Sequence, residues 1–351
     1  MKLNVAVITA GTVIASACAA EAGISVKLTP ISTPFPGAIG IDYHQPTDSV
    51  VMSVNYPSGS PNSFVRVKAD GTQLPFSTVS GLTDEVKLAT ARSGSAFPTG
   101  TVFTGNGIDG QITKISPDGT SFISAWVDLP GVGNGLMRGS LHVDRTGVWG
   151  GDLLAVTTTG EAWRINSAGT PTKVADVPPH LEGLMSVPDN VAKYGPLAGK
   201  MIAGAEGSGL LYAFDTAGGV TTHSLGVAIE DIDMINANEN FYGVNYGTGK
   251  LLGAPASYFT SAVGDILLTQ EFGGTSGLFT LKWNGSTLVT EAVTLTGDSF
   301  DPGQWEHVTF APAGIVEIPP VPEPSTYAVG LLLLAPLAAS FIRRSKQPAA
   351  Q

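Results

Sequence analysis

Short apolar or alternating segments, separated by clusters of Gly, Asn, Asp and Pro, make up most of the chain between residues 24 and 311. Such segments are typical of β-strands joined by turns. We find no long apolar run with a 3.6-residue period in this region. Five strand-like segments come just before glycine-containing turns, at 64–67, 111–115, 161–165, 210–214 and 279–283. The pattern therefore predicts an all-β protein.

The turns repeat at a nearly fixed interval. Three are closely alike and two are weaker copies: 68–72, 116–120 and 166–170, then 215–219 and 284–286. The first four turn glycines are 48, 50 and 49 residues apart: Gly71, Gly119, Gly169 and Gly218. Glycine supplies the positive φ that a tight hairpin needs. A period near 50 residues with three or four strands per unit predicts the blades of a β-propeller.

A second set of matching segments lies one strand before the body of each repeat. We expect these six segments to be the innermost strands that line a central channel: 38–42, 84–88, 139–143, 182–186, 230–234 and 306–310. Six of them predict six blades. The fifth repeat is irregular, because 250–256 is followed quickly by 264–270, so five or seven blades remain open. Ring closure is expected to use 24–28 or 305–311.

The C-terminal tail has three parts in order: Pro322-Glu323-Pro324, an apolar run over 327–342, and Arg343-Arg344. The run is shorter than the roughly 20 apolar residues of a comfortable membrane span, and a short tail anchor is one interpretation. The tail closely resembles the PEP-CTERM sorting signal, also catalogued as an ice-binding protein C-terminal motif. The resemblance covers about the last 30 residues. It implies a Gram-negative exporter, a transmembrane sorting helix recognised by an exosortase, and cleavage near Pro-Glu-Pro.

The N-terminus fits export. Lys2 precedes an apolar run over 5–17, and two A-x-A cleavage sites follow, which predicts a signal peptide over 1–22. Cys18 is the only cysteine and also loosely fits a lipidation site. The predicted organisation is a signal helix at 1–22, a propeller at 23–316, a Pro-rich linker at 317–324 and a sorting segment at 325–351.

Composition agrees with an exported β protein. Gly accounts for 44 of 351 residues, well above the usual ~7%. Without the four bases and two acids of the end signals, 14 bases and 27 acids remain, a net charge near −13. Nucleic acid needs a basic surface, so we expect no nucleic-acid partner. A cation or simple solubility suits the acidic surface.

Candidate chemistry lies in the innermost strands. Their alignment places four acids in one column: Asp84, Glu182, Glu230 and Glu306. Carboxylates that converge on one axis raise each other's pKa, and a hard divalent cation such as Ca²⁺ would relieve the repulsion. Through Glu182-Gly183 after His180-Leu181, this site faintly resembles calcium-dependent propeller lactonases of the gluconolactonase and senescence-marker type. Alternatively, these acids accept backbone hydrogen bonds at a solvated channel mouth.

Other candidate groups are few. His142, His180 and His307 are candidates for a general base, although a lone His is more often a surface or core residue. The five tryptophans would suit a sugar-stacking face, but blade cores also use Trp: Trp126, Trp149, Trp163, Trp283 and Trp305. No G-x-S-x-G, H-E-x-x-H, Walker A or EF-hand sequence occurs.

Two functions follow from these observations. The first is an exported, exosortase-processed surface or extracellular propeller without catalysis. Its partner would be an exopolysaccharide, because PEP-CTERM proteins are linked as a family to biofilm producers, or another surface protein. The second is a Ca²⁺-dependent lactonase or esterase-like hydrolase that uses the acidic channel. Fold alone does not separate them, because propellers host both classes.

Overall fold

The structure is a computed structural model. It describes residues 23–312 except for 33–34, 36, 55, 57–62, 69, 80–84, 109, 132–139, 272–276, 298–299 and 301–303. The signal peptide, linker and sorting segment predicted at the two ends lie outside the described residues. Among the residues that are described, no helix has the length and apolar character needed to cross a membrane.

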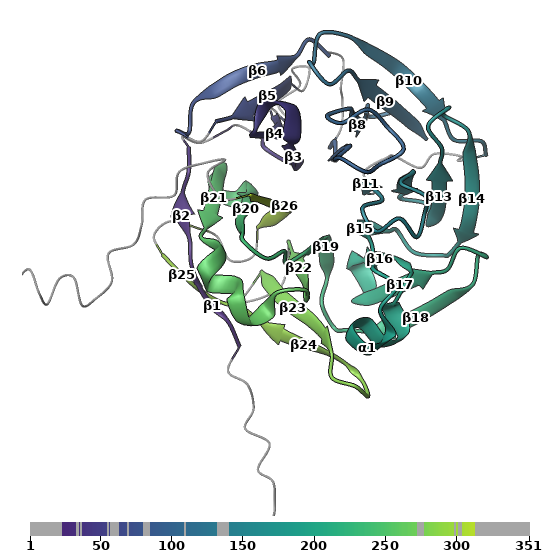
Figure 1. Cartoon of the computed structure of the whole chain (residues 1–351), viewed down its shortest axis with the longest axis vertical. Helices are drawn as coiled ribbons and strands as arrows, with labels where there is room; N and C mark the ends of the chain where they lie inside the picture. Colours follow the sequence, from purple (N-terminus) through teal and green to yellow (C-terminus); the bar gives the residue numbers. More distant parts are fainter. Residues whose placement is uncertain are drawn as a thin grey trace, which may run out of the picture.

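Six four-stranded antiparallel sheets stand side by side around a central axis, which confirms the predicted six-bladed propeller (Figure 1). In the first four blades the strands follow chain order from the axis outward. Blade 1 contains β3 (Ile41–His44), β4 (Ser49–Val54), β5 (Ser63–Val67) and β6 (Gln73–Ser77). Blade 2 contains β7 (Leu88–Thr90), β8 (Val102–Gly105), β9 (Gln111–Ile115) and β10 (Phe122–Asp128).

Blades 3 and 4 have the same order. Blade 3 contains β11 (Leu141–Val143), β12 (Leu153–Val156), β13 (Glu161–Ile165) and β14 (Pro171–Asp176). Blade 4 contains β15 (Glu182–Ser186), β16 (Met201–Ala205), β17 (Leu210–Phe214) and β18 (Val220–Ser224). The short helices are α1 (Val191–Tyr194), η1 (Gln45–Thr47), η2 (Gly195–Leu197), η3 (Glu206–Ser208), η4 (Tyr246–Thr248) and η5 (Ala256–Ala262).

Blades 5 and 6 are interleaved in the sequence, which explains the irregular fifth repeat. After β19 (Ile229–Met234), the innermost strand of blade 5, the chain crosses to blade 6 and forms β20 (Glu239–Asn245) and β21 (Lys250–Ala254). It then returns to complete blade 5 with β22 (Ile266–Gln270), β23 (Leu278–Trp283) and β24 (Leu288–Ala292). Local spacing reveals the anomaly, but it does not reveal which sheet a hairpin joins.

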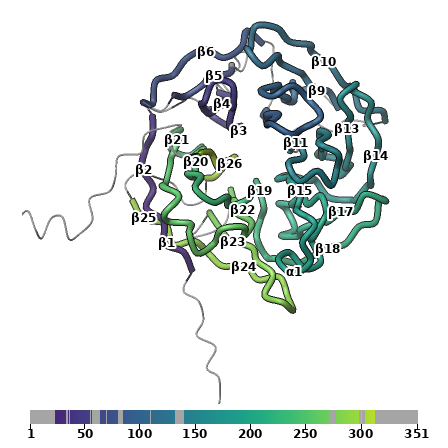
Figure 2. Tube along the Cα trace, viewed as in Figure 1, coloured from purple at the N-terminus to yellow at the C-terminus, as the bar shows by residue number. Residues whose placement is uncertain are grey.

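The two ends of the described chain close the ring in one sheet. Blade 6 takes its innermost strand, β26 (Trp305–Pro312), from the C-terminal side and its outermost strand, β2 (Thr29–Pro30), from the N-terminal side. Figure 2 shows β2 beside β21. The predicted strand at 24–28 corresponds to β1 (Ser25–Lys27), which pairs in parallel with β25 (Thr294–Thr296) outside the blade. All the residues needed for closure therefore lie within 23–312.

Hydrophobic cores lie between neighbouring blades, because both faces of each sheet are covered. In β16, for example, Met201 and Ala203 face the core shared with blade 3, whereas Ile202 faces the core shared with blade 5. Strands buried on both faces read as continuous apolar runs. Trp149, Trp163 and Trp305 are buried in these cores, so most of the predicted tryptophan set packs the blades.

The repeated turn glycines are needed for packing between blades as well as for the turn itself. Gly71, Gly119, Gly169 and Gly218 have φ values of +78°, +74°, +82° and +88°. A Cβ at Gly119 would lie 1.9 Å from the carbonyl oxygen of Phe76 on the preceding blade, and one at Gly218 would lie 2.8 Å from that of Val174. The 50-residue period therefore records a contact that each blade makes with its predecessor.

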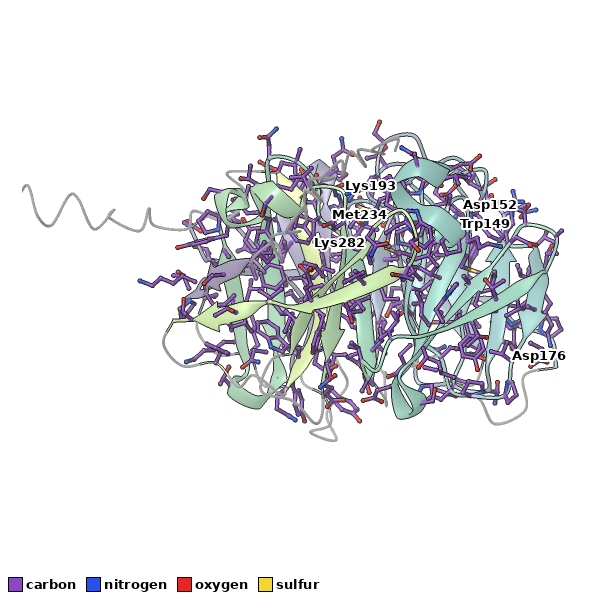
Figure 3. The ribbon with its side chains drawn as sticks, turned by 90° about the horizontal axis from the view of Figure 1, so that it is seen from below. Trp149, Asp152, Asp176, Lys193, Met234 and Lys282 are labelled. Atoms are coloured by element: carbon purple, nitrogen blue, oxygen red, sulfur yellow. The ribbon has the colours of Figure 1, made fainter. Side chains whose placement is uncertain are left out.

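All six predicted innermost segments correspond to the innermost strands, although β3, β7 and β11 begin later than predicted, at Ile41, Leu88 and Leu141. Neighbouring innermost strands are parallel in register: the Val308 and Phe310 N–H groups donate to the carboxylates of Asp231 and Asp233. We call the face where these strands begin the entry face and the face where they end the exit face. Figure 3 labels Trp149, Asp152, Lys193 and Met234 toward the exit face, and Asp176 toward the opposite face.

Candidate functional site in the central channel

The entry end of the channel brings three of the four predicted acids together. Glu182, Glu230 and Glu306 stand at or next to the starts of β15, β19 and β26, and each is buried. Asp84 lies outside the described residues. Carboxylate oxygens of Glu85, Glu230 and Glu306 lie within 4.8 Å of one another, and so do those of Glu182, Glu206 and Glu230. Glu230 is therefore the centre of two overlapping groups.

Lys87 is the cation of this cluster, and the sequence interpretation missed it. Its side chain is 1% exposed, and its Nζ lies 2.9 Å from Glu230 Oε1. The same ammonium donates a hydrogen bond of 2.9 Å to the backbone carbonyl of Glu230. Lys is almost never fully buried unless it is paired. A lysine within the apolar context Val86-Lys87-Leu88 was the available signal.

Burial and mutual repulsion divide the carboxyls into two kinds. Burial raises the pKa of Glu182 and of Glu306 well above the usual range, and the Glu230 carboxylate adds to both shifts. Burial would also raise the pKa of Glu230, but Lys87 opposes it, and the pKa of Glu230 is lowered. Glu271, which is half-buried nearby, has a pKa raised to about 8 by burial and by Glu230. The site thus contains one stable carboxylate–ammonium pair surrounded by carboxyls that hold protons readily.

Two of the candidate histidines reach this cluster. His180 Nε2 lies 3.0 Å from Glu182 Oε1, and His307 Nε2 lies 3.9 Å from Glu230 Oε1. Burial lowers the pKa of His307 well below its usual value, so its imidazole is neutral. His142 lies on β11 with Nε2 3.2 Å from Ser186 Oγ, and burial lowers its pKa to about 3. These histidines are neutral or partly exposed neighbours of the acids.

Oxygen donors at this end suit a hard cation in number and chemistry. Glu306 Oε2 is buried and has no hydrogen-bond partner among the described residues. An orphaned carboxylate oxygen beside two further carboxylates fits a Ca²⁺ ligand set, whereas the adjacent ammonium of Lys87 repels a second cation. Two kinds of positive charge could therefore offset the repulsion between the carboxylates: the Lys87 ammonium, which the chain supplies, or a bound divalent cation.

A second ionic network, centred on Asp42, lies toward the exit end of the channel. Its carboxylate accepts hydrogen bonds from the Thr90 N–H at 2.8 Å, from Arg92 Nη2 at 3.1 Å and from Arg145 Nη2 at 3.0 Å. Thr309 Oγ1 donates to it at 3.2 Å. Burial would raise the pKa of Asp42, but the two guanidinium groups reverse this and hold it below its usual range. Asp42 thus joins residues of four blades.

Between these networks the channel is narrow. The cavity bounded by Asp42, Lys87, His142, Asp231 and His307, among others, has a volume of about 40 Å³. That is room for a few water molecules, whereas organic ligands occupy pockets of roughly 300–1,000 Å³. This space between the two networks is therefore too small for an organic substrate.

No protein-family model and no curated protein sequence matches the chain. Solved structures do match it. The virginiamycin B lyase from Staphylococcus aureus is 11% identical over 83% of this chain and 97% of its own, with a TM-score of 0.48. A gluconolactonase from Xanthomonas campestris is 13% identical over 79% and 84%, with a TM-score of 0.47. At these identities the likeness to both proteins is one of fold alone.

Proposed function

We propose that this chain is an exported Gram-negative protein whose propeller binds a polysaccharide or another surface protein without catalysis. The observation that carries this proposal is the burial of Lys87 against Glu230. An ammonium from the chain itself neutralises the centre of the acid cluster, as a catalytic metal would have to do. The narrow channel beneath it holds water-sized groups. Binding of a macromolecule therefore falls to the outer surfaces of the ring.

The tail supplies the support for location. Pro322-Glu323-Pro324, the apolar run and Arg343-Arg344 resemble an exosortase signal, so the exosortase is the expected processing partner, and the membrane holds the chain only before cleavage. The N-terminal export signal agrees. After processing, the body would reach the cell surface or the extracellular matrix.

The test is cosedimentation of the body, residues 23–318, with exopolysaccharide prepared from the producing cells. The body contains both closing strands, so it should fold alone. We expect retention that is unchanged in Glu182→Gln, which leaves the Lys87–Glu230 pair in place, because the channel acids take no part. The proposal would be refuted if the body cosedimented neither with exopolysaccharide nor with outer membranes isolated from the producing cells.

A second candidate function is a Ca²⁺-dependent lactonase or esterase-like hydrolase. The orphaned Oε2 of Glu306 favours it, and Glu85 and Glu230 would complete the ligand set. A bound divalent cation polarises a substrate carbonyl, while His180, held by Glu182, is placed to move a proton. A lactone and ester screen in Ca²⁺ tests this function. Activity that is lost in Glu182→Gln/Glu230→Gln would establish it, and an inactive body would exclude these substrates.

A further inference from the structure

A polar cleft of about 340 Å³ opens toward the exit face between blades 3 and 4. It is formed by the loop before β12, the β13–β14 turn and the β17–β18 turn of the next blade. Its lining includes Trp149, Asp152, Arg164, Asn166 and Thr216. Figure 3 labels the first two of these side by side. The volume lies within the range of small-ligand pockets, which is roughly 300–1,000 Å³.

The neighbouring gap between blades 2 and 3 shows why this cleft is open. Both outer strands contain a bulge, and Trp126 in β10 and Val174 in β14 stand at the same position, just before the residues that pair with Ile112 and Ala162. A Cβ at Gly169 would lie 3.2 Å from the Trp126 ring, so the indole fills that gap. Val174 has too small a side chain to fill the equivalent space. The cleft is therefore a position where one blade pair lacks the ring that fills the other.

Some polar groups of the cleft are held in place by hydrogen bonds, and one has no hydrogen-bond partner among the described residues. Arg164 Nε donates to Asp152 Oδ2 at 2.6 Å, which fixes the guanidinium while its side chain remains 40% exposed. The Trp149 side chain is buried, and its indole N–H has no hydrogen-bond partner in the part of the chain that the structure describes. A buried donor of this kind is costly to leave unpaired, and it belongs to one of the residues that line the cleft.

Charge in the cleft is balanced. Asp152 neutralises Arg164, and Lys173 is paired with Glu161 while its ammonium lies 5.3 Å from the centre of the Trp163 ring. A cleft without excess charge does not select an ion. It instead offers amide, hydroxyl, guanidinium and carboxylate groups to a neutral ligand rich in hydroxyls. The net negative charge of the body further disfavours polyanions.

We propose that this cleft binds one sugar unit of a neutral polysaccharide, an inference that rests on the proposed surface-binding function. The sugar ring takes the place that the Trp126 indole occupies one blade earlier. Arg164, Asp152 and Asn166 bind its hydroxyls, and the Trp149 N–H donates to one of its oxygens.

The probes are three neutral hexasaccharides, cellohexaose, laminarihexaose and mannohexaose, with hexaguluronate as the anionic comparison. Affinity for the body is measured by calorimetry and contact by saturation-transfer NMR. Val174→Trp should fill the cleft and weaken binding at least 30-fold. Lys114→Met, at the position equivalent to Arg164 beside the filled gap, is the matched control and should stay within twofold of the wild type.

Trp149→Phe keeps the ring in its core and removes only the N–H. If that donor serves a ligand, binding weakens about 3- to 10-fold, as expected for one hydrogen bond, while the melting temperature does not fall. This variant keeps the test decisive even if Val174→Trp folds poorly.

If the wild type binds a neutral hexasaccharide and Val174→Trp weakens that binding at least 30-fold, the result supports the cleft as the sugar-binding site. Unchanged affinity in both Val174→Trp and Trp149→Phe would place the sugar elsewhere and overturn the inference, while the proposed surface function would stand. Failure of the wild type to bind any neutral probe would also overturn the inference. The surface function is then decided separately, by cosedimentation with native exopolysaccharide.

Discussion

Replacing Lys87 with Met removes the ammonium that pairs with Glu230 at the acidic end of the channel and keeps a side chain of similar length. The Glu230 carboxylate would remain, 2% exposed, without its partner at 2.9 Å and without the donor to its backbone carbonyl. Breaking a buried ion pair by removing one partner costs about 3–5 kcal/mol. We expect the free energy of unfolding of the body to fall by that amount at pH 8.

The loss should depend on pH, and its direction follows from Glu230. In the wild type the folded-state pKa of Glu230 is lowered, so its contribution to stability is present above the unfolded pKa and is lost in acid. Without Lys87, burial raises the pKa of Glu230 in the folded state. The variant is then most stable below the unfolded-state pKa of Glu230, which is about 4.3, and it loses stability as pH rises through the folded-state pKa of Glu230. The difference between the two proteins should therefore be smaller at pH 5 than at pH 8.

Urea unfolding at pH 5 and pH 8 measures both effects, with the m-value as a check that the unfolded surface is unchanged. The double variant Lys87→Met/Glu230→Gln removes both charges and should recover much of the loss. A loss below about 1 kcal/mol, equal at both pH values, would refute the view that Lys87 neutralises the cluster.

Three further predictions concern the exit end, the turns and the tail. Asp42→Asn should destabilise the body by about 3–5 kcal/mol in urea at pH 7, because two guanidinium groups lose their carboxylate. Since the folded pKa of Asp42 is lowered, the deficit should shrink below pH 4, and a loss that is constant with pH would contradict this. Gly119→Ala should unfold at a lower temperature than Gly285→Ala. Both variants place a Cβ on a residue with positive φ, at a cost of about 1–2 kcal/mol. A Cβ at Gly285, however, meets nothing within 4 Å. Equal losses of stability in the two variants would show that the contact between blades is unimportant. Replacing residues 322–324 with alanines should leave the tail uncleaved in the native host, as seen by the mass of the exported protein, and normal processing would contradict the exosortase prediction.

The architecture could be predicted from sequence because it repeats. Gly71, Gly119, Gly169 and Gly218 mark one turn per blade, and the same packing constraint acts on each. The exchange of strands between blades 5 and 6 could not be predicted, because strands β20 and β21 look the same whichever sheet they join. Such pairing is decided by contacts between segments far apart in the chain.

The candidate site was predicted in part. Column alignment finds acids that converge, since equivalent positions of innermost strands face one axis, and Glu182, Glu230 and Glu306 do so. It does not find Lys87, because a long side chain reaches a charge that lies 143 residues further along the sequence. The polar cleft is likewise defined by a residue that is smaller than its counterpart, Val174 against Trp126. No motif marks such a difference.

The most direct test of whether Lys87 takes the place of a metal in the channel is a thermal melt of the body, residues 23–318, in EDTA and then in millimolar Ca²⁺. A ligand at 100 times its dissociation constant adds about 2.7 kcal/mol, which would move the melting temperature by a few degrees. If Lys87 already neutralises the acids and the propeller is a binding protein, the two melts coincide. A clear rise in Ca²⁺ that disappears in Glu182→Gln/Glu230→Gln would contradict the account and make the channel a metal centre.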